Sequence, residues 1–326
     1  MRVALQGIGV VGGFGYGVDQ LAKRLQTVGS RHGAKGGKIN FKSVHRWTVD
    51  TEPLKQLFPP RQLRRIDHFS RMALMSAFGA IKDAETGGLI PERERSGVVL
   101  TTGYGATRTT FGFLDSVIDD GDALASPTHF ANSVHNSAAA HVAMLTGAKG
   151  PNLTIGQFDA PIGEGLLTAC QMLQEKRVQT VLFGGVDEYC DVLAYCHAKM
   201  GCQNRAVPIG EGAVFLVLGC EEGLQNSRMK PKYGWLTNVS KQPKVHMPDL
   251  LTVYSDIYGQ IPIASGFDLA IAALSLNAAH IDAISRQATT AHSGVVFNDR
   301  ELSATVYIKD WGHFTISRVV RGAENP

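Results

Sequence analysis

Three short, mostly apolar runs constrain the fold of this chain most strongly. They span residues 97–102, 178–183 and 213–218 and are rich in valine, leucine and phenylalanine. Runs of this length without polar alternation are typical of strands that are covered on both faces. Helical patterns separate them, most clearly over residues 66–84, where apolar residues recur at intervals of three and four. Strands that alternate with helices predict an α/β protein built in layers.

Weaker signals complete the expected order of elements. The run over 178–183 is expected to stop at Gly184-Gly185, and Pro161 stands where a helix can begin without losing a hydrogen bond. The other expected strands span residues 2–8, 152–156, 234–239, 294–298, 303–308 and 314–320. The other expected helices span residues 17–28, 108–118, 138–147, 161–175 and 264–279.

Composition excludes several classes of protein. The chain has 326 residues, of which 44% are hydrophobic, so it can bury a large core. A net charge of +3 is too small to predict nucleic acid or a membrane surface as partner. No apolar run is long enough to cross a bilayer, no signal peptide is visible, and the five cysteines form no disulfide framework. These features predict a cytoplasmic protein.

Arginines cluster at Arg61, Arg64 and Arg65, before the long helical pattern. Such a cluster either meets an acidic partner or is solvated surface, and the sequence leaves both open.

A glycine pattern near the N-terminus matches a dinucleotide-binding motif. Residues 7–12 read G-x-G-x-x-G between an apolar strand and a helix. The glycines continue to Gly17, however, so the helix begins too late to meet a pyrophosphate, and no acid follows at the end of a second apolar strand. The motif is therefore interpreted as a decoy, and no cofactor is expected.

Five segments together resemble the β-ketoacyl synthase family. They occur in family order and span residues 7–25, 64–84, 126–152, 178–188 and 209–218. The resemblance implies a thiolase-like α/β fold, with two βαβαβ-type halves in a layered αβαβα arrangement. The halves would span residues 1–220 and 221–326, with the second half shortened, and would form one compact unit.

The resemblance places Asp159 where active members carry a catalytic cysteine. Counting from Gly150-Pro151, the aligned segment reads Gln157-Phe158-Asp159-Ala160-Pro161. A cysteine at a helix N-terminus gains acidity and faces backbone N–H groups that hold an oxyanion. A carboxylate cannot take over the acyl chain as a thioester, but it can cap the helix. Asp159 is therefore interpreted first as an N-cap.

The other catalytic positions are also altered. The family's Lys-x-x-x-Gly-His pattern aligns with Ser255 at the lysine and Gln260 at the histidine. The family's His-Gly-Thr segment has no counterpart, and its glycine-rich C-terminal loop is reduced to residues 309–313. General acid–base and nucleophilic groups work only together, so the resemblance implies no catalytic residue in this chain.

Within the family, cysteine-less chain-length factors pair with an active ketosynthase and shape the acyl tunnel at the shared interface. They usually carry glutamine where this chain has Asp159, so the analogy is incomplete at that position. By this analogy the tunnel and interface residues are Thr107, Arg108, Phe111, Leu114, Phe130 and Phe158. The implied partners are an active ketosynthase, or a second copy, and an acyl carrier protein whose phosphopantetheine carries the substrate.

The resemblance thus predicts a non-catalytic subunit of a 3-oxoacyl-[acyl-carrier-protein] synthase in fatty acid, polyene or polyketide biosynthesis. Two alternatives stay open. One is an enzyme of altered chemistry on acyl-carrier-protein thioesters, such as a malonyl decarboxylase with Asp159 or a cysteine in the active role. The other is a stand-alone carrier-protein binding module. No metal site is expected, because Cys190, Cys196, His197 and Cys202 do not have the spacing of structural zinc ligands.

Overall fold

The computed structural model describes residues 2–31, 46–158, 161–200, 207–222, 230–242, 254–277, 293–298, 303–310 and 313–321. The first 220 residues contain strands β1 (Arg2–Gly12), β2 (Gly15–Tyr16), β3 (Arg46–Trp47), β4 (Ser96–Thr102), β5 (Asn152–Gly156), β6 (Thr180–Asp187), β7 (Ile209–Gly210) and β8 (Gly212–Cys220). Their helices are α1 (Val18–Arg31), α2 (Pro60–Leu63), α3 (His68–Thr86), α4 (Thr107–Asp120), α5 (Pro127–Ser133), α6 (Ser137–Thr146), α7 (Pro161–Gln174) and α8 (Asp191–Lys199). Short 3₁₀ helices are η1 (Glu52–Gln56), η2 (Arg93–Arg95) and η3 (Asp122–Leu124).

The rest of the described chain contributes β9 (Trp235–Gln242), α10 (Ser255–Tyr258), α11 (Ala264–Asn277), β10 (Ser293–Asn298), β11 (Ser303–Asp310) and β12 (His313–Val320). These bounds agree with the sequence-based elements to within a few residues, apart from β1, β6 and the short elements that the sequence did not predict. Among the described helices, none is long and apolar enough to span a membrane.

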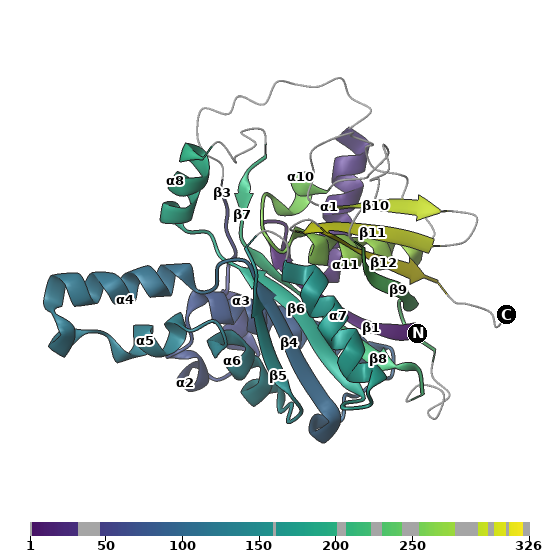
Figure 1. Ribbon diagram of the computed structural model, residues 1–326, viewed down its shortest axis with the longest axis horizontal. Coiled ribbons are helices and arrows are strands. Elements are labelled where there is room, and N and C mark those ends of the chain that lie inside the picture. The colour runs from purple at the N-terminus through teal and green to yellow at the C-terminus, as the bar shows by residue number, and fades with distance from the viewer. Residues whose placement is uncertain are drawn as a thin grey trace.

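One mixed sheet runs through the molecule in the order β10-β11-β12-β9-β1-β8-β6-β4-β5, with β2 paired to β1. Two described pairs of this sheet, β4–β5 and β4–β6, are parallel, and the other described pairs in it are antiparallel. Helices α7 and α11 lie between the β4–β6–β8 region and strands β9–β12, whereas α3 and α6 cover the opposite face of the first region (Figure 1). The structure confirms the predicted thiolase-like α/β layering.

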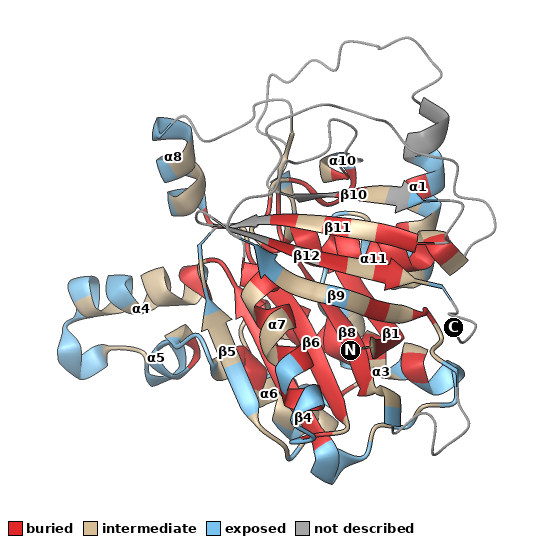
Figure 2. Ribbon diagram, turned by 45° about the vertical axis from the view of Figure 1, so that its right-hand side comes forward, coloured by how far each residue is buried: buried red, intermediate tan, exposed pale blue. Residues whose placement is uncertain are grey.

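Two hydrophobic cores follow from these layers. The first surrounds α7 and α11 and includes Phe183 and Phe267, and the second lies beneath α3 and α6 and includes Phe69 and Phe215. Strands β4, β6 and β8 are buried along almost their whole length (Figure 2). Coverage on both faces explains why their sequences are apolar without alternation.

The N-terminal glycine motif lies inside β1 and not in a loop. A Cβ on Gly7 would stand 2.2 Å from the Ala80 carbonyl oxygen, and one on Gly9 would stand 1.9 Å from that of Ser76. The Ser76 hydroxyl also donates to the Gly9 carbonyl at 2.7 Å. The glycines therefore allow α3 to pack directly on the strand, and the expected end of this strand at residue 8 was wrong.

The expected end of β6 at Gly184-Gly185 was also wrong. A Cβ on Gly184 would lie 2.3 Å from the Val214 carbonyl oxygen and 2.4 Å from the Phe215 ring. These glycines allow a close approach inside the sheet and do not form a turn. Strand β6 consequently continues to Asp187 and carries this acid into the interior.

Candidate functional site

Three segments meet where β4 ends. A Cβ on Gly103 would lie 2.5 Å from the Phe158 carbonyl oxygen and 2.5 Å from Cβ of Pro262. The N–H of Gln157 donates to the Thr102 carbonyl at 3.0 Å, which ties the segment after β5 to the same point. Asp159 follows Phe158 directly but lies outside the described residues, so its interpretation as an N-cap stays a prediction.

Gln260 belongs to this meeting point, two residues before Pro262. Its N–H donates to the Pro208 carbonyl at 2.7 Å, and its own carbonyl accepts from the Gly210 N–H at 3.0 Å. Ser255 begins the short helix α10, and its carbonyl accepts from the Gly259 N–H at 2.8 Å. The structure therefore brings the segments of Phe158 and Gln260 together and leaves Ser255 one helical turn earlier.

Two buried acids at the end of β6 hold the β4–α4 connection in place. The Asp187 carboxylate accepts from the Thr102 hydroxyl at 2.7 Å and from the Gly103 and Tyr104 N–H groups at 2.9 and 3.2 Å. Glu188 Oε1 accepts from the Arg108 N–H at 2.7 Å, in the first turn of α4. These bonds satisfy donors that a loop and a helix N-terminus would otherwise leave unpaired.

Burial shifts the acidity of both groups. It raises the pKa of Asp187 to about 7, although the hydrogen bonds from Gly103, Thr102 and Tyr104 oppose the shift. It raises the pKa of Glu188 to about 8, and the bond from Arg108 opposes that shift. Sequence reasoning missed this pair, although two acids directly after a buried strand are a signal that could have found it.

The tunnel residues implied by the resemblance occupy α4, α5 and the segment before α7. Thr107 is buried and Phe111 half-buried, whereas Arg108 is exposed. Leu114 is 44% exposed, Phe130 on α5 is 59% exposed, and Phe158 is 61% exposed. The structure therefore presents the large apolar members of this set to solvent, and their role in a tunnel stays a prediction.

A tyrosine–histidine pair adjoins Phe158. The Tyr104 hydroxyl lies 3.0 Å from Nε2 of His197 on α8, and the Tyr104 and Phe158 rings are 5.8 Å apart. Tyr104 was not among the predicted residues, since nothing in the sequence links two side chains so far apart along the chain.

Cys170 does not provide an activated nucleophile. Burial raises the pKa of Cys170 to about 12, which makes its thiol inert near neutral pH, as its interpretation as a core residue implies. Cys190 is buried, Cys196 is exposed, and Cys202 lies outside the described residues.

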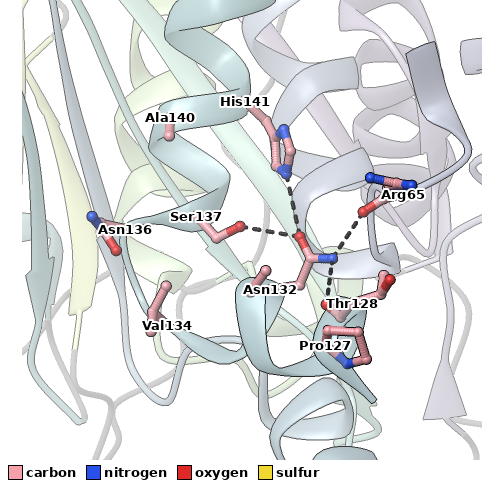
Figure 3. Close-up of a pocket in the computed structure, with 10 residues that line it drawn as sticks. Arg65, Pro127, Thr128, Asn132, Val134, Asn136, Ser137, Ala140 and His141 are labelled. Carbon is pink, nitrogen blue, oxygen red and sulfur yellow. Dashed lines mark hydrogen bonds between the residues drawn. The ribbon is translucent and has the colours of Figure 1, made fainter.

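A cavity of about 530 Å³ lies between α5, α6 and the segment before α3 (Figure 3). Asn132 stands at its wall, where its Nδ2 donates to the carbonyls of Arg65 and Thr128 at 2.8 and 3.0 Å. Its Oδ1 accepts from the Ser137 hydroxyl at 3.1 Å and lies 3.2 Å from His141 Nε2. Burial lowers the pKa of His141 and Asp67 opposes this, and the lowered pKa favours the neutral ring. Because the amide Oδ1 of Asn132 can only accept, Nε2 is the donor in this contact.

Asn132 is therefore fully engaged within the protein. Apolar side chains supply much of the remaining wall, namely Pro127, Ala131, Val134 and Ala140. The polar atoms of Ser137 and His141 at this wall are directed at Asn132, and the cavity is suited to an apolar group.

Comparisons with known proteins agree with this fold. The N-terminal domain of β-ketoacyl synthases matches residues 18–206, which is more than half of the chain. No curated protein sequence matches. A structure described as the ishigamide ketosynthase/chain length factor has 17% identity and a TM-score of 0.71, and the match covers 98% of this chain and 100% of that one.

Two further structures are similar. A type II polyketide synthase acyl-carrier protein in complex with its ketosynthase bound to the hexaketide has 12% identity and a TM-score of 0.72, covering 98% of this chain and 99% of that one. A β-ketoacyl synthase from Burkholderia phymatum STM815 has 13% identity and a TM-score of 0.67, covering 98% and 100%. At these identities the likeness establishes the fold, and the domain match establishes the family: this chain belongs to the β-ketoacyl synthases.

Proposed function

We propose that this chain is a non-catalytic subunit of the chain-length-factor type, which pairs with an active ketosynthase in fatty acid, polyene or polyketide biosynthesis. The observation that carries the proposal is an uncovered apolar surface. Eleven of the twelve large apolar side chains exposed among the described residues lie between Thr107 and Met200. They are Leu114, Ile118, Leu124, Phe130, Val134, Met144, Leu153, Phe158, Val192, Tyr195 and Met200.

The elements that carry these side chains lie together on one side of the molecule, where α4, α5, α6, β5 and α8 are found (Figure 1). Strand β5 is an edge of the described sheet and pairs there only with β4. Exposed apolar groups beside an open strand edge are typical of a surface that another protein covers. We call this set of eleven side chains the apolar face.

The site beside the apolar face supports a non-catalytic role. A condensing enzyme needs a thiolate and groups that polarise the malonyl thioester. Asp159 and Gln260 occupy the corresponding positions in the sequence, and Cys170 is too buried to act as nucleophile. A partner with an intact site would supply the chemistry, while substrate would arrive on the phosphopantetheine of an acyl carrier protein.

Under this proposal Phe111, Leu114, Phe130 and Phe158 line the tunnel or the interface, with Thr107 and Arg108 at the root of α4. This assignment is supported by Leu114, Phe130 and Phe158, which are exposed and belong to the apolar face. A wall of such side chains suits an extended acyl chain, which buries apolar surface along its length.

Co-expression with each cysteine-bearing synthase subunit of the source genome, followed by native mass measurement, tests the pairing. We expect a one-to-one complex with one of them. Leu153→Lys on β5 should abolish it, whereas Ile90→Lys, at a side chain 78% exposed outside the apolar face, should leave it intact. A chain that stays a monomer or homodimer beside every such subunit would contradict the proposal.

One observation favours a second candidate, an enzyme of altered chemistry. The hydrogen-bonded Tyr104–His197 pair lies beside Phe158, the residue that precedes Asp159 in the sequence, and both of its side chains can act in acid–base chemistry. Incubation of the purified chain with malonyl carrier protein tests this candidate by the appearance of acetyl carrier protein. Decarboxylation that is lost in both Asp159→Asn and His197→Gln would support it, and a turnover that neither variant changes would exclude these residues.

A further inference from the structure

Helices α4 and α5, with η3 between them, form an arm that spans residues 107–133. Thr107 is the only buried residue of α4, and Asn132 is the only one of α5. The arm is held mainly by its own contacts: the Phe113 and Phe130 rings lie 5.3 Å apart, and Ser126 N–H donates to the Ser116 hydroxyl at 3.2 Å. It extends away from the body of the protein (Figure 1).

The charge of the arm is predominantly negative. From Thr109 to Ala148 the chain contains four aspartates and no lysine, arginine or glutamate. The aspartates are Asp115, Asp119, Asp120 and Asp122, all exposed, and within the described residues none of them forms an ion pair. The arm's only strong cation is Arg108, at its root.

Acidic and apolar side chains run side by side along α4. Leu114 and Ile118 are four residues apart and share a stripe, and Asp115 and Asp119 form the adjacent stripe. Ile118 is 79% exposed, and Leu124 at the tip is 72% exposed. A binding partner must therefore offer apolar contact and positive charge together.

We infer that the arm docks into a basic, apolar groove of a synthase subunit different from this chain, and that its aspartates disfavour pairing with a second copy. The inference rests on the proposed function and adds the chemistry that selects the partner. In a twofold-symmetric homodimer whose axis passes through this surface, the arm of one copy faces the arm of the other. The four aspartates of one arm would then lie opposite the four of the second. Like charges facing each other suppress that pairing, whereas a basic groove accelerates encounter.

Neutralising the arm tests the inference in two measurements. The arm variant is Asp119→Asn/Asp120→Asn, and the matched control is Glu85→Gln/Glu92→Gln, which also removes two exposed acids but outside the arm. The first measurement is the association rate with the co-purifying cysteine-bearing subunit in about 50 mM and about 500 mM NaCl. The second is sedimentation of each purified chain alone.

We expect the arm variant to associate about tenfold more slowly than wild type at low salt, and the two to converge at high salt. The control should match wild type throughout. Alone, the wild-type chain should be less self-associated than the arm variant at low salt.

Equal low-salt rates for wild type and arm variant would overturn the inference and leave the proposed function intact. If no synthase subunit associates at any salt concentration, the proposed function fails. Sedimentation of the isolated chains still tests whether the aspartates disfavour pairing with a second copy. If wild type self-associates as strongly as the arm variant, this part of the inference is overturned. If wild type self-associates more weakly, it is supported.

Discussion

The two ends of α4 are held in opposite ways. At its root, the buried carboxyl group of Glu188 accepts from the Arg108 N–H, and Asp67 accepts from the Thr109 hydroxyl at 2.9 Å. At its far end, Ile118 is 79% exposed and the helix ends at Gly121, in the left-handed region with φ of 81°. One end is fixed by buried polar bonds, and the other packs against α5 and η3 of the same arm.

This difference shows what the fold stabilises and what it leaves for a partner. Burying a carboxylate is costly unless hydrogen bonds offset the lost solvation, so two adjacent buried acids need a structural reason. Here they set the direction in which α4 leaves the sheet. A rigid root with an uncovered apolar tip is the arrangement expected of an element that acts at an interface.

Matched glycine substitutions should give the largest contrast between body and arm. In Gly9→Ala, the new Cβ would stand 1.9 Å from the Ser76 carbonyl oxygen, so we expect a loss of more than about 3 kcal/mol in unfolding free energy. In Gly112→Ala, the nearest atoms belong to the His129 ring at 3.4 Å, and better helix propensity should stabilise by up to about 1 kcal/mol. Urea unfolding followed by circular dichroism measures both, and equal effects would show that the arm is packed like the core.

Removing the carboxylate at the root should have the next largest effect. Asp187→Ala leaves the donors of Thr102, Gly103 and Tyr104 without their acceptor, and we expect a loss of about 3 kcal/mol. Asp187→Asn keeps one acceptor oxygen and should lose about 1 kcal/mol. Urea titrations of the two variants in parallel check this order, and the reverse order would refute the assigned bonds.

The pH dependence of the unfolding free energy should show that the pKa of Glu188 is raised in the folded state. Its pKa rises from about 4.3 in the unfolded chain to about 8 in the fold. The folded state therefore retains a proton that the unfolded state releases, and stability falls as pH rises through this window. Glu188→Gln should match wild type near pH 4.5 and exceed it by about 2 kcal/mol near pH 6, and the difference should keep growing up to about pH 8. A difference that does not change with pH would mean that Glu188 ionises as freely in the fold as in water.

The smallest effect on stability is expected on the arm. Phe130 is 59% exposed and keeps contact only with Phe113 among the described aromatic rings, so Phe130→Ala should cost less than about 1 kcal/mol in the isolated chain. Thermal unfolding checks this value. A cost as large as that of a core phenylalanine would show that the arm packs on the body.

Much of the fold was predictable because local patterns determine it. Helix α3 was expected over residues 66–84 and spans His68–Thr86, where Asp67 accepts from the Ser70 N–H at 3.0 Å and defines its start. The prediction ended strand β6 too early, at Gly184-Gly185. In the structure Phe215 from another strand fills the space beside Gly184, and Ile162 and Ile263 fill the space beside Gly185. Propensity alone cannot distinguish a glycine in a turn from one that allows a close contact.

The site was predictable in outline only. The resemblance to the family predicted that the segments of Phe158 and Gln260 belong to one site, and these segments do meet around Gly103. The Tyr104–His197 bond joins residues 93 positions apart, so no spacing rule could have found it. The exposure of the apolar face was equally hidden, because an apolar residue in a helix reads the same whether the core or a partner covers it.

Hydrogen exchange of the arm's backbone amides, with and without the ketosynthase partner, tests the central claim most directly. The account predicts that amides of α4 beyond its first turn and of α5 exchange quickly in the isolated chain. They should slow by about tenfold or more in the complex, while β4 and β6 stay protected in both states. Arm amides that exchange at the same rate in the complex and in the isolated chain would contradict the claim that this surface is built for a partner.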